Sequence, residues 1–285
     1  MACRLPEHQR FGGASQHTLC YHIVKYFRTI WNMAMRNQAP PQGAQAALRA
    51  IRLLKLFTSE TPELQLAEIC ELSGLNKTTT HRLLQALYSE ELLARNPATG
   101  SYRLGPGLMA LGVQALSSND LRLRARPLLR KLAEDTGETA TLEIPIDDTM
   151  LILDEVTGKH FVGAAGNVGT RWPMHATSTG KALIAFDQRG PERLSEHLPS
   201  LTSKTITRHE TLRKQLGEIR RRGFAETVDE LEDGFSGVGT VVRGVMGEVV
   251  GAISICGPTQ RMPETRRAQL GVILCQVAER LQPHY

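Results

Sequence analysis

Hydrophobic residues recur with a helical period in three successive segments of the first half of the chain. The first begins near Ala46, and the others are Leu66–Cys70 and Asn76–Leu87, with Ser73-Gly74-Leu75 breaking the pattern between them. Apolar residues three or four positions apart form one face of a helix. We therefore expect three helices, of which the first buries a face made of Ala47, Ala50, Ile51, Leu54 and Phe57.

The third segment has two unlike faces and precedes a β-hairpin. Thr80 joins its apolar stripe, whereas its outward positions carry hydroxyl, amide and cationic groups. Two short extended runs, 92–95 and 101–104, flank a turn at Pro97–Gly100. This order of elements predicts a winged helix-turn-helix, whose second helix lies in the major groove of DNA. The apolar stripe is Leu83, Leu84 and Leu87.

Strands mixed with helices are expected in the second half. A helical connector over Leu108–Leu116 and a helix from Asp120 to Gly137 come first. Because the later strands are joined largely by short turns, we expect an α+β domain with a mainly antiparallel sheet flanked by helices. The expected strands are Thr139–Ile146, Met150–Val156, His160–Val162, Gly239–Arg243 and Val249–Cys256, and the expected helices are 178–187, 210–222 and 263–281.

Charge and cysteine content narrow the class of protein. Residues 1–130 contain 16 Lys and Arg against 8 Asp and Glu, and residues 131–285 contain 18 against 21. A basic front half fits a module that binds a polyanion. The five cysteines lie far apart without zinc-ligand spacing, which favours a reduced, cytoplasmic setting. No apolar run reaches the length of a membrane span.

The start of the second motif helix carries the chemistry expected of a DNA-reading surface. Asn76 is placed to cap the helix, and free amides at a helix start favour phosphate. Lysine and arginine neutralise phosphates, arginine also pairs with guanine, and hydroxyl groups reach base edges. The predicted DNA contacts are Asn76, Lys77, Thr78, Thr79, His81 and Arg82 on the helix, with Arg95, Tyr102 and Arg103 of the wing gripping the flanking backbone.

Several ordered motifs resemble the isocitrate-lyase-regulator (IclR) family of bacterial transcription factors. In the first half they are Leu66-Ala67-Glu68-Ile69, Ser73-Gly74-Leu75, Thr78 to Leu87 and Gly100 to Gly105. In the second half they are Pro173 to Leu183, Asp229 to Gly234 and Ala252 to Pro258. The resemblance covers about residues 46–282. It implies a winged helix, a linker helix and an effector domain, in dimers that often pair into tetramers. It also implies regulators that mostly repress and sometimes activate.

A small-molecule site is expected in the second half. The hydroxyl-rich start of the helix at Thr177–Gly180 would suit a carboxylate, or Thr177 or Ser178 serves only as a cap. On the strand that ends at Cys256, alternation places Ser254 and Cys256 on one face and Ile253 and Ile255 on the other. The family resemblance extends the effector set to Phe161, Ser178, Thr179, Thr227, Gly237, Ser254 and Cys256.

Three departures from the family pattern bear on the ligand. Some relatives have an acidic residue where Thr227 stands, and many have a cysteine near Gly237. The ligand then differs from theirs, or the pocket is more open. Many relatives have leucine at the position of Trp172, whose ring would cover the pocket or pack beside it.

The expected organisation follows from these assignments. Residues 1–43 form a flexible N-terminal extension, or translation begins at Met33 or Met35. A basic helix with an apolar stripe is the alternative for this region. Residues 44–104 form the winged helix-turn-helix, 105–119 the linker helix, and 120–285 the effector-binding and oligomerisation domain. The expected partners are a palindromic double-stranded operator, a small effector such as an organic acid, and further copies of the chain.

Three other functions have some support in the sequence. Ser178 and Lys181 match the S-x-x-K string of acyl-transfer enzymes, but the companion motifs of those enzymes are missing, so no catalytic residue is expected. The scattered histidines have no metal-ligand spacing, and neither a metal nor a cofactor is expected. A constitutive architectural DNA binder would bind at any ligand level and with little choice of sequence.

Overall fold

The computed structural model describes residues 43–58, 61–159 and 167–282 of the 285-residue chain. The chain forms two compact units, which divide between Gln114 and Ala115. In the part that is described, no helix is both long enough and apolar enough to cross a membrane.

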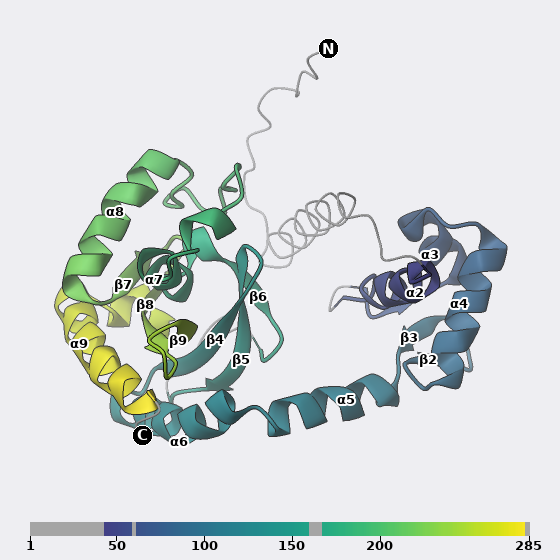
Figure 1. Ribbon diagram of the computed structural model, residues 1–285, viewed down its shortest axis with the longest axis horizontal. Coiled ribbons are helices and arrows are strands. Elements are labelled where there is room, and N and C mark those ends of the chain that lie inside the picture. The colour runs from purple at the N-terminus through teal and green to yellow at the C-terminus, as the bar shows by residue number, and fades with distance from the viewer. Residues whose placement is uncertain (1–42, 59–60, 160–166, 283–285) are drawn as a thin grey trace, which may run out of the picture. The chain divides into compact units, whose positions relative to one another are not determined.

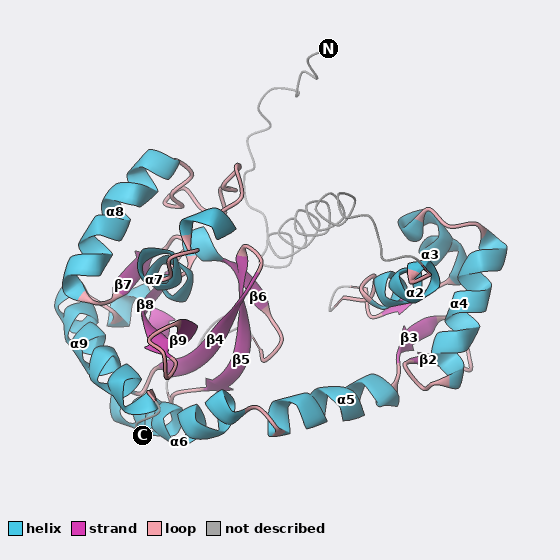
Figure 2. Cartoon of the chain, viewed as in Figure 1, coloured by secondary structure: helices cyan, strands magenta, loops and turns pink. Residues whose placement is uncertain are grey.

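The first unit contains the predicted helices and a small sheet. The helices are α2 (Gln45–Leu54), α3 (Leu66–Ser73) and α4 (Lys77–Ser89). The sheet, drawn in magenta beside α4 in Figure 2, has the antiparallel order β1-β3-β2. The predicted hairpin is β2 (Leu93–Arg95) with β3 (Tyr102–Leu104), and β1 (Glu63–Leu64) is a third strand that the sequence did not predict.

The core of the first unit corrects the predicted face of α2. Ile51 is 48% exposed and Ala47 is also exposed, whereas Leu53 is fully buried. Because α2 ends at Leu54, Leu56 and Phe57 lie in the following turn and reach the core from there. The helix is therefore rotated relative to the predicted stripe. These residues pack in one cluster with Ile69, Leu84, Leu87, Leu93 and Tyr102.

The connector is a helix, α5 (Pro106–Ser117), in which no residue is buried. Its beginning is fixed to the segment between α4 and β2 by Gly105, whose backbone N–H donates to the Leu92 carbonyl at 2.9 Å. A Cβ at Gly105 would lie only 2.1 Å from the Glu91 carbonyl oxygen, so only glycine fits this approach. The chain therefore leaves the wing along a defined path.

The second unit is built on a six-stranded antiparallel sheet with the order β6-β5-β4-β9-β8-β7 (Figure 1). Short edge strands β6 and β7 were not predicted, and the expected strand at His160–Val162 lies outside the described residues. The strands are β4 (Thr139–Ile146), β5 (Thr149–Val156), β6 (Arg171–Pro173), β7 (Ala225–Val228), β8 (Phe235–Arg243) and β9 (Val249–Pro258). The helices are α6 (Asp120–Thr136), α7 (Ser178–Phe186), α8 (His209–Arg222) and α9 (Glu264–Leu281), with short 3-10 turns at Met174–Ala176, Pro191–Arg193 and Thr259–Arg261.

Helices cover both faces of this sheet. One core joins the sheet to α6 and α9 and includes Ile253 and Ile255 of β9. The other core joins the sheet to α7 and α8 and includes Ala252. The predicted alternation along β9 is therefore confirmed, and it directs Ser254 and Cys256 away from Ile253 and Ile255. This alternation leaves polar side chains beneath the start of α7.

Candidate DNA-binding surface and effector pocket

The start of α4 presents its polar side chains to solvent. The Asn76 Oδ1 accepts a hydrogen bond from the Thr79 backbone N–H at 2.9 Å, so the predicted N-cap is present. Thr80 is fully buried, and its hydroxyl donates to the Asn76 carbonyl at 3.0 Å. The remaining predicted contacts on this helix are exposed except for half-buried Thr79: Asn76, Lys77, Thr78, His81 and Arg82.

Positive charge in the first unit is local rather than general. The sequence of residues 43–117 contains seven Lys and Arg against six Asp and Glu, so this segment is nearly neutral. However, α4 itself contains Lys77, His81 and Arg82 and no acidic residue. The basic excess of residues 1–130 therefore comes mainly from residues 1–42 and 118–130. Within residues 43–117, an attraction to DNA would depend on the basic face of α4 and the wing arginines.

In the wing, one predicted contact is corrected. Arg95 and Arg103 are exposed, but Tyr102 is only 2% exposed and belongs to the core of the unit. The Arg95 guanidinium lies 5.2 Å from the centre of the Tyr102 ring. Tyr102 is thus a residue that supports Arg95 and does not fit a direct contact with the DNA backbone.

Glu63 holds the turn of the wing and was missed by the sequence reasoning. Its carboxylate accepts hydrogen bonds from the Ser101 hydroxyl at 2.6 Å and the Asn96 amide at 3.0 Å. These hydrogen bonds, with nearby Arg103, lower the pKa of Glu63. Glu63 lies in the short strand β1, which has too few residues for a hydrophobic pattern to reveal it.

The second unit contains a pocket between the start of α7 and the sheet. Its empty volume, which includes the space at its open mouth, is about 530 Å³. Trp172 lines the pocket. Phe161 lies outside the described residues. The other six residues of the predicted effector set all line the pocket: Ser178, Thr179, Thr227, Gly237, Ser254 and Cys256.

Strand register explains how residues far apart in sequence meet here. Thr227 of β7 pairs with Gly237 of β8, which pairs with Cys256 of β9. In the neighbouring row, Ser254 of β9 pairs with Thr141 of β4, which pairs with Glu155 of β5. Side chains in register on one face of a sheet lie next to each other. The floor of the pocket therefore has polar side chains from four of five adjacent strands, β7, β9, β4 and β5, while β8 contributes Gly237.

The helix start above this floor is capped and lies very close to the sheet. Thr177 is the N-cap, and its hydroxyl accepts from the Gly180 N–H at 3.1 Å. A Cβ at Gly239 would lie 2.9 Å from the Thr179 nitrogen, and one at Gly237 would lie 3.0 Å from the Ser178 Oγ. Glycine at these two positions of β8 therefore lets the start of α7 come close to the sheet.

Two carboxyl groups in the pocket were not predicted. Glu143 is only 5% exposed and accepts hydrogen bonds from the Thr179 hydroxyl at 2.7 Å and the Thr141 hydroxyl at 2.8 Å. Burial raises its pKa. Burial, and then the charges of Glu143 and Asp154, raise the pKa of Glu155 to about 7. Burial also raises the pKa of the Cys256 thiol, so this cysteine is neutral rather than nucleophilic.

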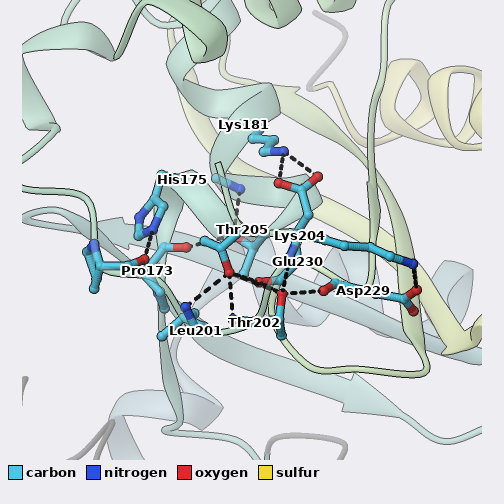
Figure 3. Close-up of polar contacts among 12 residues, drawn as sticks. Pro173, His175, Lys181, Leu201, Thr202, Lys204, Thr205, Asp229 and Glu230 are labelled. Atoms are coloured by element: carbon cyan, nitrogen blue, oxygen red, sulfur yellow. Dashed lines mark hydrogen bonds and ion pairs between the residues drawn. The ribbon is translucent and has the colours of Figure 1, made fainter. Parts of the chain in front are cut away.

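A buried polar cluster fixes the loop that follows β7 (Figure 3). The Lys181 ammonium of α7, which is fully buried, donates to the Glu230 carboxylate at 2.6 Å. The hydroxyls of Thr202 and Thr205 donate to the carbonyls of Asp229 and Glu230 at 2.6 and 2.7 Å. Lys181 is therefore held by an ion pair and cannot act as the free base that the S-x-x-K reading requires.

His175 likewise has a structural environment. Its Nε2 lies 2.9 Å from the Pro199 carbonyl oxygen, to which it donates. Burial lowers the pKa of His175 to about 4, so its ring is neutral at neutral pH. Among the residues that the structure describes, no three His, Cys, Asp or Glu side chains are grouped to hold a metal ion.

Comparison with known proteins gives one consistent family. Residues 46–97 match the sequence model of the IclR helix-turn-helix domain, and residues 113–282 match that of the bacterial transcriptional regulator IclR C-terminal domain. The chain is 35% identical over 243 residues to the HTH-type transcriptional regulator Rv1719 of Mycobacterium tuberculosis, covering 83% of this chain and 91% of that protein.

Two further relatives bear on function. The DNA-binding transcriptional repressor YiaJ of Escherichia coli is 32% identical over 249 residues, covering 84% of this chain and 87% of that protein. A crystal structure of an IclR homologue from Microbacterium hydrocarbonoxydans, complexed with 4-hydroxybenzoate, aligns with a TM-score of 0.72 and 26% identity. That alignment covers 83% of this chain and 97% of the homologue.

Proposed function

Because the chain belongs to the IclR family of bacterial transcriptional regulators, we propose that it is a ligand-responsive repressor. In this proposal it binds a palindromic operator through α4 and the wing and senses a small organic metabolite in the pocket beside α7. The observation that carries the proposal is the pairing of a solvent-facing, acid-free α4 with a polar pocket in a separate unit. YiaJ supports the choice of repression over activation.

The DNA contact rests on the side chains at the start of α4. Lys77 and Arg82 supply charge, Thr78 and His81 supply hydrogen-bonding groups, and Asn76 fixes the helix end that presents them. Arg95 and Arg103 of the wing would contact the flanking phosphates. Tyr102 is left out of this set because it is buried.

A palindromic operator requires two copies of the chain, and α5 supports such a dimer. Its exposed side chains include Met109, Leu111 and Val113, which are 67%, 56% and 62% exposed in the single chain. An exposed apolar helix of this kind is typical of a surface that pairs with another protein surface. A two-fold pair of chains would place two α4 helices about one DNA turn apart.

The proposed switch couples ligand in the second unit to operator affinity in the first. A ligand can shift such an equilibrium only if it binds two states of the protein with different affinity. The chain path from wing to second unit runs through α5, so we place the coupling there. The homologue crystallised with 4-hydroxybenzoate supports a small organic compound as the ligand type.

The decisive experiment uses the full chain and DNA from the region upstream of its own gene. Footprinting should protect one inverted repeat, and adding the bound metabolite should change operator affinity by several-fold, as allosteric coupling normally does. Repression is tested by transcription from that promoter with and without the protein. Unprotected DNA at low salt would refute operator binding, and constant affinity under a ligand shown to bind would refute the switch.

A further inference from the structure

We propose that the effector pocket takes a small organic cation, a primary amine or amidine on an apolar body, in preference to a carboxylate. This inference rests on the proposed function, since it assigns a ligand class to the same pocket. It departs from the organic acid that the hydroxyl-rich start of α7 suggests by itself.

The charged groups in the pocket wall are all acidic. Glu143 and Glu155 line it, and no Lys, Arg or His does among the described residues. The nearest lysine along α7, Lys181, is fully buried in its ion pair with Glu230 and is not part of the wall. A cation in this pocket would therefore meet opposite charge without a competing protein cation.

One of these carboxyl oxygens lacks a hydrogen bond. The Glu155 Oε2 is buried and has no partner within the described part of the chain. A buried acceptor left without a donor destabilises the free protein, and a ligand N–H would satisfy it. Glu143, in contrast, is held in place by the Thr179 and Thr141 hydroxyls. Each Glu143 oxygen accepts one of these hydrogen bonds and keeps a second lone pair, which a ligand N–H could use.

The rest of the wall suits the apolar body of such a ligand. Ile152, Trp172, Leu231 and Phe235 contribute hydrophobic and aromatic surface. An aromatic face also attracts an ammonium group when water is excluded. The pocket thus combines acceptors at its floor with an apolar and aromatic wall, which is the arrangement that organic amines need.

The start of α7 does not outweigh this acidity. Thr177 already satisfies the Gly180 N–H, and a helix N-terminus typically favours an anion by only about fivefold. One like charge at contact distance, in the intermediate dielectric of a protein, disfavours it by roughly a hundredfold or more. Above about pH 7, where Glu155 is ionised, its charge therefore decides the sign of the preference.

The test is isothermal titration calorimetry of the full chain at pH 8. Glu155 is ionised there because this pH lies above its raised pKa of about 7. The probes are three pairs with equal numbers of carbon atoms and opposite charge: 4-hydroxybenzylamine with 4-hydroxybenzoate, benzylamine with benzoate, and butylamine with butanoate. At least one amine should bind, roughly tenfold or more tightly than its acid. An acid that binds as well as its amine, or no amine binding at millimolar concentration, overturns the proposal.

Variants locate the preference in the pocket. Glu155→Gln should weaken amine binding about tenfold and shrink the difference within each pair, whereas Glu155→Asp should keep it. Glu192→Gln, at the exposed turn Pro191–Arg193, is the matched control and should change nothing. An unchanged preference in Glu155→Gln would also overturn the proposal. Circular dichroism of each variant verifies that it is folded.

Repeating the titrations with the operator complex separates this inference from the proposed function. If amines bind while operator affinity stays constant, the ligand class stands and the regulatory switch fails. If a carboxylate alters operator affinity while no amine binds, the switch stands and the ligand class fails. Amine binding that changes operator affinity supports both.

Discussion

Arg82 and Lys77 are both exposed on α4, but we expect them to contribute to DNA binding in different ways. If Arg82 pairs with a guanine, Arg82→Ala should weaken specific binding by about 1–3 kcal/mol and relax base choice at one position. If Lys77 meets one phosphate, Lys77→Ala should weaken all sequences alike and reduce the salt slope by about one unit. Titrations at several salt concentrations, with operator and random DNA, measure both. A wild-type footprint for Arg82→Ala would exclude the guanine contact.

Glu155 gives a second prediction because its pKa changes on folding, from an ordinary value of 4.5 to about 7. The folded protein then binds this proton more tightly, so stability from this group is greatest below about pH 4.5 and is lost as pH rises to about 7. Discounted for partial exposure, Glu155→Gln should remove a penalty on the order of 1–2 kcal/mol at pH 8 and none at pH 4.

Urea unfolding followed by Trp172 fluorescence checks this pH dependence. Trp172 lines the pocket. The other tryptophan of the chain, Trp31, is replaced by phenylalanine in both the parent and Glu155→Gln, so that the fluorescence comes from Trp172 alone. The variant should gain stability over the parent only as pH rises toward 8. Equal stability of the two proteins across this pH range would show that Glu155 titrates normally.

The pocket residues show what sequence could and could not supply. The strand over Thr139–Ile146 was predicted with its observed bounds, and alternation along it places Thr139, Thr141 and Glu143 on one face. That alternation could have identified Glu143, whose buried neighbours Ala140 and Leu142 belong to the opposite core. The pairing of Thr141 with Glu155 could not be predicted, because register across strands depends on the whole sheet.

At the scale of elements, variants of the N-cap of α4 distinguish an effect on stability from an effect on DNA affinity. Asn76→Ala removes the hydrogen bond to the Thr79 N–H and should cost about 1 kcal/mol of stability and weaken operator binding. Asn76→Asp keeps the cap and places a negative charge at the helix start, which stabilises the helix but repels phosphate. Thermal unfolding and operator titration of both variants test this. If Asn76→Asp bound DNA like the parent, the start of α4 would not face a phosphate.

Elements with a long periodic pattern were predicted well, and short ones were missed. Helices α3, α4, α6, α8 and α9 match their predictions within a few residues. The missed strands β1, β6 and β7 have two, three and four residues, so each depends on a partner strand more than on its own pattern. The buried face of α2 was mispredicted for a different reason. Residues beyond the end of the helix reach the core, so the helical period does not apply to them.

At the scale of the whole molecule, the first unit has one core, the second has a core on each face of its sheet, and the chain passes between the units through α5. The order of helices and hairpin already indicated DNA binding by the first unit, whereas the family resemblance supplied most of the proposed effector-binding role of the second. It did not supply the acidity of the pocket, which comes from residues of this chain. Ligand class can therefore differ from that of a relative whose fold is the same.

The exposed apolar face of α5 leads to the last prediction, at the level of assembly. Met109 and Val113 lie one helical turn apart and are both largely exposed in the single chain. If they pack against a second copy, the double variant Met109→Lys, Val113→Lys places four charges in the dimer contact and should give monomers. Because a palindrome is bound by two chains together, operator affinity should fall by more than about tenfold.

Sedimentation velocity and footprinting measure these two effects on the same samples. Met246→Lys is the control, because Met246 is 92% exposed in the turn between β8 and β9 and is equally apolar. Its sedimentation and footprint should match those of the parent. A double variant that sediments like the parent would place the dimer contact elsewhere. Monomers that still protect both half-sites would show that each chain binds its half-site independently, and the proposed pairing through α5 would then have no role in reading the operator.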